Sequence, residues 1–199
     1  MRFAKTLARL GLVASVLTPA TAYAHTGIGE ASGFVHGFMH PVGGLDHILA
    51  MVAVGTFAAL MGGRALWLVP AAFVAMMAFG GYMGIEGIEL PLVEIGIAGS
   101  VVVLGLAVAL RWSPPVVVAM GLVGLFAIFH GHAHGAEMPL DASGLGYAIG
   151  FMLATALLHA AGIGVGLVAG RIGRGSLLAS RAFGGAIALA GVGILAGWL

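Results

Sequence analysis

Residues 145–170, LGYAIGFMLATALLHAAGIGVGLVAG, contain no Asp, Glu, Lys or Arg. A helix needs about 20 apolar residues to cross the hydrocarbon core of a bilayer, so this stretch is long enough to span a membrane. Five other stretches share its apolar character: 45–61, 65–84, 92–110, 115–131 and 182–199. The sequence therefore predicts an all-α polytopic membrane protein that folds as a bundle of six transmembrane helices.

The overall composition agrees with this assignment and excludes several classes of protein. Apolar residues make up 61% of the 199 residues and charged residues 8%, against about 45–50% and 25% in an ordinary globular domain. A net charge of +1 provides no basic surface, so nucleic acid is not expected as a partner, whereas the lipid bilayer is. The chain has no cysteine, so a metal ion must be bound by nitrogen, oxygen or thioether sulfur.

The N-terminal residues 1–24 are predicted to be a cleaved signal peptide. Three basic residues precede a short apolar run at 10–17, and Ala-Tyr-Ala at 22–24 fits a small-x-small cleavage site. A cut two residues earlier and an uncleaved anchor are the alternatives. The mature chain, 25–199, would then be a single domain of six transmembrane helices that begins with His25 outside the cytoplasm.

The charges predict how the helices are oriented. If the mature N-terminus is periplasmic, the loops after the first, third and fifth spans face the cytoplasm. These loops and their flanks hold every basic residue of the mature chain: Arg64, Arg111, Arg171, Arg174 and Arg181. All seven acidic residues fall in or beside the periplasmic segments. This positive-inside distribution predicts a bacterial inner-membrane protein with a periplasmic mature N-terminus.

Glycines at a spacing of four predict close packing of helices. Gly162, Gly166 and Gly170 form one stripe in the fifth span, and Gly193 and Gly197 repeat the spacing in the sixth. Small residues at this spacing let two helix backbones approach closely in a membrane. The sequence leaves the oligomeric state open, with a homo-oligomer among the alternatives.

Histidines supply most of the polar chemistry of the chain. Seven of the eight lie on the predicted periplasmic side, beside the first and fourth spans: His25, His36, His40, His47, His130, His132 and His134. The eighth, His159, is in the middle of the fifth span, where it is either a functional group or a hydrogen-bonding tie to another helix. Together with the carboxylates of Asp46, Glu94 and Glu137, these imidazoles suit nickel, cobalt, zinc or manganese.

Two stretches carry a resemblance to a known family. Residues 36–51, HGFMHPVGGLDHILAM, resemble the first signature of the HupE/UreJ family, a histidine followed after five residues by Asp-His. The matching residues here are His40, Asp46 and His47. Adjacent helical residues point about 100° apart, so one of Asp46 and His47 is expected to bind metal while the other orients a ligand.

The second signature of the same family is matched by residues 129–137, FHGHAHGAE. Its recurring members correspond to His130, His134 and Glu137, whereas His132 occupies a variable position. Leu90-Pro91 followed by Glu94 is also similar to the start of the third span in that family.

The resemblance implies secondary transport of nickel or cobalt as substrate, with no prosthetic group and no enzymatic activity, in support of hydrogenase, urease or cobalamin pathways. The residues expected to contact the metal along its path are His40, Asp46, His47, His130, His134, Glu137, Glu94, His36, His25 and His159. The absence of a G-x-x-x-x-G-K-[ST] loop agrees with transport that uses no nucleotide.

Two alternatives to transport remain. A membrane metallohydrolase would use the i, i+4 pair His36 and His40, although no H-E-x-x-H motif is present, and a sensor or metallochaperone would bind metal without transporting it.

Overall fold

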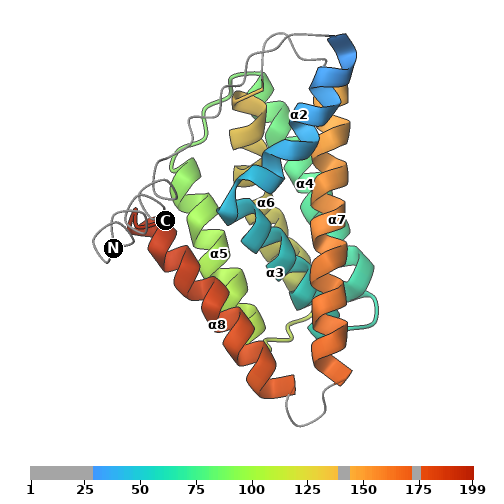
Figure 1. Cartoon of the computed structure of the whole chain (residues 1–199), viewed down its shortest axis with the longest axis vertical. Coiled ribbons are helices and arrows are strands. Elements are labelled where there is room, and N and C mark those ends of the chain that lie inside the picture. The colour runs from blue at the N-terminus through green and yellow to red at the C-terminus, as the bar shows by residue number, and fades with distance from the viewer. Residues whose placement is uncertain (1–28, 139–143, 172–175) are drawn as a thin grey trace, which may run out of the picture.

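The computed structural model describes residues 29–138, 144–171 and 176–199, which form helices and short connections without any strand (Figure 1). The predicted signal peptide and His25 lie outside the described residues. The helices are α2 (Gly29–Gly43), α3 (Leu45–Met61), α4 (Ala65–Ile85), α5 (Val93–Ala109), α6 (Val116–Ala136), α7 (Gly144–Arg171) and α8 (Ser176–Leu195).

Each of the six predicted spans overlaps a helix, which confirms the all-α fold, although the last helix begins six residues before the predicted span 182–199 and ends at Leu195. Within the described ranges, α4, α6, α7 and α8 are long and apolar enough to cross a membrane, and α2 with α3 adds a fifth candidate if that bent pair is one span. The remaining apolar helix, α5, has only 17 residues. The chain is thus an all-helical multi-pass membrane protein with four or five candidate spans, and the count of six crossings stays a prediction.

A sharp bend separates α2 from α3. The two helices differ in direction by 81°, and Gly44 between them is extended, with φ −100° and ψ 123°. The bend lies within the length of the bundle rather than at its upper end (Figure 1). It brings the last turn of α2, with His40, and the first turn of α3, with Asp46 and His47, to the interior of the bundle.

Glycines allow the helices to pack in close pairs, α4 on α6, α3 on α7 and α5 on α8. A Cβ atom at Gly131 would collide with the Met77 carbonyl, and one at Gly162 with the Val52 carbonyl. Gly162 and Gly166 therefore pack α7 on α3, as their spacing predicts, although Gly170 has no such neighbour. The prediction for Gly197 was wrong, because it follows the end of α8 in the left-handed conformation, with φ 69°.

The two ends of the bundle differ in charge. Arg64 precedes α4 and Arg111 follows α5, and the start of α4 and the end of α5 lie toward the lower end of the bundle in Figure 1. At the opposite ends of these two helices, Glu86 caps the C-terminus of α4 and Glu94 lies in the first turn of α5. The charge segregation on which the orientation depends is therefore present in space, while the orientation itself stays a prediction.

Candidate metal centre

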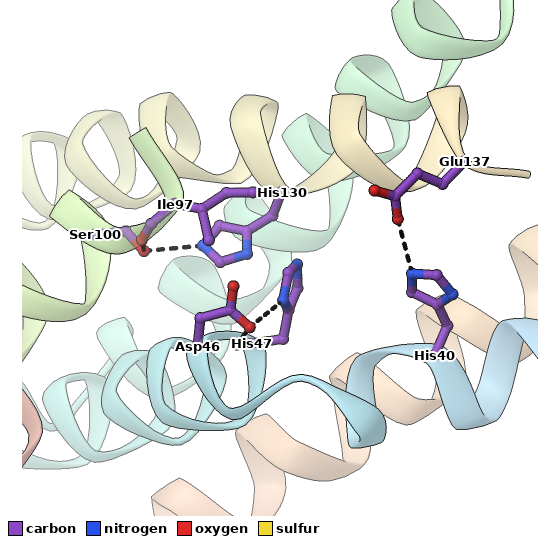
Figure 2. A network of polar contacts seen from close by, with 7 residues as sticks. All are labelled: His40, Asp46, His47, Ile97, Ser100, His130 and Glu137. Atoms are coloured by element: carbon purple, nitrogen blue, oxygen red, sulfur yellow. Dashed lines mark hydrogen bonds and ion pairs between the residues drawn. The ribbon is translucent and has the colours of Figure 1, made fainter. Parts of the chain in front are cut away.

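Three of the predicted ligands meet where the last turn of α2 faces the end of α6. One ligand atom from each of His40, His134 and Glu137 lies within 4.8 Å of the others. His40 Nε2 is 3.3 Å from Glu137 Oε2 (Figure 2). The Glu137 side chain is 60% exposed, whereas His134 is buried. We name these three residues the outer group. Its Glu137 carboxylate is accessible from the surroundings, whereas His134 lies in the interior.

Imidazoles continue from the outer group into the bundle. The ring centroids of His40 and His134 are 4.5 Å apart, those of His134 and His47 are 4.3 Å apart, and those of His47 and His130 are 4.6 Å apart. We name these four residues, in this order, the histidine file. Because they come alternately from the α2–α3 bend and from α6, the file joins these elements through ring contacts. Its rings succeed one another and do not surround one point, so the arrangement differs from a closed four-ligand cage.

Asp46 fixes the tautomer of His47. Asp46 Oδ1 accepts hydrogen bonds from the backbone N–H and from Nδ1 of His47, both at 2.7 Å (Figure 2). A carboxylate only accepts, so Nδ1 carries the proton and Nε2 of the neutral ring keeps its lone pair. That Nε2 is buried without a partner. Gly44 leaves room for the pair, because a Cβ there would lie 2.7 Å from Asp46 Oδ1.

Ser100 orients His130 in the same manner from α5. The Ser100 hydroxyl donates to the Ile97 carbonyl at 2.6 Å, so its oxygen is left to accept from His130 Nε2 at 2.8 Å. His130 Nδ1 then keeps its lone pair, and it too is buried without a partner. The hydrogen bonds from His47 to Asp46 and from His130 to Ser100 match the arrangement in which a neighbouring polar group orients a metal-binding imidazole.

The interior contains an unusual number of unpartnered ring nitrogens. In the part of the chain that the structure describes, seven buried histidine nitrogens make no hydrogen bond: Nε2 of His47, Nδ1 of His130 and His132, and both nitrogens of His134 and His159. Each buried polar group without a partner costs about 1–3 kcal/mol. The presence of so many unpartnered nitrogens is explained if several of them bind a metal ion.

The other predicted residues lie outside the outer group and the file. His36 is exposed on α2, one turn before His40, and Glu94 is exposed in the first turn of α5. His132 points away from the file and donates Nε2–H to the Ile88 carbonyl at 2.7 Å, which ties α6 to the connection after α4. His159 is buried on α7, with its ring centroid 5.0 Å from that of Phe73.

Two residues of the site were missed by sequence reasoning. Ser100 is the only hydroxyl in the third apolar stretch, and a polar residue inside a membrane helix is itself a signal of a contact between helices. Phe73 lies 5.8 Å from His130 and 5.0 Å from His159, measured between ring centroids. Nothing distinguishes Phe73 from the other apolar residues of its helix in the sequence.

Ser100→Ala tests the orientation of His130. The variant leaves His130 Nε2–H without its acceptor, and outer partners of metal ligands typically contribute about 10–100-fold in affinity or activity. Since the resemblance of the two signatures implies transport of nickel or cobalt, we expect nickel uptake into cells to fall by about tenfold, with normal protein in the membrane by immunoblot. Ser180→Ala is the matched control, because Ser180 is also buried and bonds to a carbonyl of its own helix. Equal uptake by the two variants would contradict the role of Ser100.

Comparisons with known proteins cover nearly the whole chain. The family model described as HupE / UreJ protein matches residues 13–194. Protein HupE of Rhizobium leguminosarum bv. viciae is 49% identical over 185 residues, which span 93% of this chain and 95% of that relative. No solved structure matches the chain.

Proposed function

Because the chain belongs to the HupE/UreJ family, we propose that it is a permease that imports a divalent transition-metal cation, nickel or cobalt, across the bacterial inner membrane. The metal is the substrate, and the chain performs no enzymatic step. The mature N-terminus and the outer group face the periplasm. The imported ion supplies metal for hydrogenase, urease or cobalamin.

The observation that carries this proposal is the histidine file. Imidazole is a ligand suited to nickel and cobalt, and consecutive rings 4.3 to 4.6 Å apart allow an ion to exchange one ligand at a time. Conduction requires sites that bind well enough for the ion to enter but weakly enough for it to leave. A sensor or metallochaperone needs one tight site, which the file does not resemble. A hydrolase needs an activated water in an open position at a single metal.

The membrane potential is sufficient to drive uptake. Moving one charge across 100 mV is worth about 2.3 kcal/mol, so a dication gains about 4.6 kcal/mol on reaching a negative cytoplasm. This energy corresponds to an accumulation of about a thousandfold. The transport step therefore needs no nucleotide.

Transport by the purified protein in proteoliposomes tests the proposal. We expect radioactive nickel to accumulate when an inside-negative potential is imposed, and to accumulate much less without it. Unlabelled nickel and cobalt should compete, whereas magnesium and calcium, which prefer oxygen ligands, should not. Saturable nickel binding without any accumulation would favour the sensor or metallochaperone instead.

Glu94 is a predicted contact for the arriving ion. Its side chain is exposed in the first turn of α5, inside the third predicted span, where an unpaired carboxylate is costly enough that it is expected to face the path of the ion. We expect Glu94→Gln to lower uptake severely at limiting nickel with normal membrane levels. Glu89→Gln, in the preceding connection and also exposed, is the control. Unchanged uptake by Glu94→Gln at limiting nickel would remove Glu94 from the path.

A further inference from the structure

His159 lies beyond the inner end of the histidine file. It is 2% exposed, and neither of its ring nitrogens has a hydrogen-bond partner. The ring meets the Phe73 ring edge-on, at a centroid distance of 5.0 Å and an angle of 88°. Phe73 also contacts His130, the last member of the file. The Phe73 ring therefore contacts both His159 and the last imidazole of the file.

A second contact between the same two helices lies one turn away. Met77 follows Phe73 by four residues on α4, and Thr155 precedes His159 by four residues on α7, so each pair shares a helix face. The Thr155 hydroxyl donates to the Met77 sulfur at 3.6 Å. Met77 is 1% exposed and Thr155 is fully buried. Imidazole nitrogen, hydroxyl oxygen and thioether sulfur thus line one interhelical seam.

The backbone around this seam is held in place by close packing. A Cβ atom at Gly55 of α3 would collide with the His159 carbonyl, so α3 and α7 are in direct backbone contact behind the imidazole. The side chains of the seam keep their freedom, because methionine is unbranched and adapts its rotamer readily. The Thr155 hydroxyl already contacts the Met77 sulfur, and His159 lies one turn further along the same face of α7.

We propose that His159, Met77 and Thr155 form an inner transit site for the divalent transition-metal cation, on the seam between α4 and α7 beside Phe73, which the ion reaches after the histidine file. This site rests on the proposed import function and extends it with a second set of ligands.

The chemistry of the three ligands suits a site that releases its ion. All are neutral, whereas the outer group contains the Glu137 carboxylate and the file has Asp46 beside it. A dication is therefore held less tightly at the inner site than at the outer group, and its affinity falls in the direction of transport. Imidazole and thioether also favour nickel, cobalt and softer ions over magnesium and calcium, which prefer oxygen.

A purely structural role does not explain His159 well. A buried imidazole that makes no hydrogen bond lowers stability relative to an apolar side chain of similar volume. A leucine would fill the same space against Phe73 without leaving two ring nitrogens unpartnered. The hydroxyl of Thr56, by contrast, is satisfied by the carbonyls of Val52 and Gly162 on the neighbouring α3–α7 contact.

Equilibrium dialysis of the full chain in detergent against radioactive nickel tests the inner site. We expect two classes of nickel sites in the parent, and only the tighter one in His159→Leu. Met77→Leu and Thr155→Val, which nearly keep side-chain volume, should weaken the looser class. Loss of even an outer partner of a metal ligand typically weakens binding or activity by about 10–100-fold, so uptake by His159→Leu should fall by about tenfold or more. Thr56→Val is the matched control and should retain both classes.

The outcomes separate the inner site from the import function. A single class of sites in the parent, or a looser class retained in all three variants, would overturn the inner site. If His159→Leu does not reach the membrane, Met77→Leu and Thr155→Val decide, and an unchanged looser class in both overturns it. Because dialysis requires no transport, loss of the looser class supports the site even if parent vesicles accumulate no nickel. Nickel uptake that is normal in all three variants would overturn the inner site and leave the import function standing.

Discussion

Replacing His47 by alanine is expected to abolish nickel uptake while the protein still inserts and resists heat like the parent. His47 contacts both His134 and His130 in the file, so its removal leaves a gap that an ion bound by one ring at a time has to cross without a ligand. Its Nε2 makes no hydrogen bond within the protein, and its Nδ1 bonds only to the adjacent Asp46, so removal of the ring breaks no hydrogen bond between helices. The measurements are uptake of radioactive nickel and the melting temperature of the purified protein.

Asp46→Asn is expected to have a smaller effect of the same kind. An asparagine oxygen still accepts from His47 Nδ1, but the carboxylate charge that makes the imidazole a stronger ligand is lost. Uptake should therefore fall by about 10–100-fold. His36→Ala is the control on the exposed face of α2, one turn from His40, and at saturating nickel it should transport like the parent.

The competing explanation is that Asp46 and His47 only tie helices together. In that case both variants would be less abundant and less stable to heat even where the remaining protein still transports. Each lost hydrogen bond would lower the stability by about 1–2 kcal/mol in a membrane. Nickel provides the decisive comparison, because a ligand at 100 times its Kd stabilises the folded state by about 2.7 kcal/mol. We expect nickel to raise the melting temperature of the parent but not of His47→Ala. Full uptake by His47→Ala at limiting nickel would refute the role of the file.

The membrane-spanning helices could be predicted because every residue of a span contributes to its mean hydropathy, so the signal is strong over about 20 residues. Residues 145–170 have no charge, and their single helix α7 covers the entire stretch. Helix α2 was not predicted, because residues 29–43 contain no long apolar run. It packs on α7, where Cβ atoms at Gly37 and Gly150 would collide with the carbonyls of Tyr147 and Phe34. Such contacts between distant segments leave no periodic signal in the sequence.

The sequence was enough to predict which residues form the candidate site, but not which of them contact one another. The angle between adjacent helix positions predicts that Asp46 and His47 do not both bind one ion. In the structure Asp46 bonds to the His47 ring and the far nitrogen of that ring is unpartnered, while binding of metal by His47 stays a prediction. The contact of Ser100 with His130 depends instead on how α5 is rotated against α6. That rotation is set by packing between the helices, for example of Gly96 on Phe129. It cannot be predicted from the sequence of either helix alone.

Glu137→Gln is expected to lower uptake at limiting nickel by about a hundredfold. Glu137 supplies the only carboxylate of the outer group, and its exposed side chain is the first member that an ion arriving from water meets. The glutamine keeps the size of the side chain but not the charge that helps to replace the hydration shell of the cation. Initial rates of uptake over a range of nickel concentrations, measured in proteoliposomes, give the KM and the maximal rate.

The matched control is Glu86→Gln, because Glu86 is also exposed and also caps a helix C-terminus, that of α4, whereas Glu137 caps α6. Only Glu137 lies beside His40, so Glu86→Gln should transport like the parent. The shape of the defect carries further information. Loss of a capturing ligand at the outer group raises KM, and high nickel restores much of the rate by mass action, whereas loss of His47 inside the file lowers the maximal rate at every concentration. If Glu137→Gln instead lowered the maximal rate with KM unchanged, capture would have to occur elsewhere, and Glu137 would act on a later step of transport.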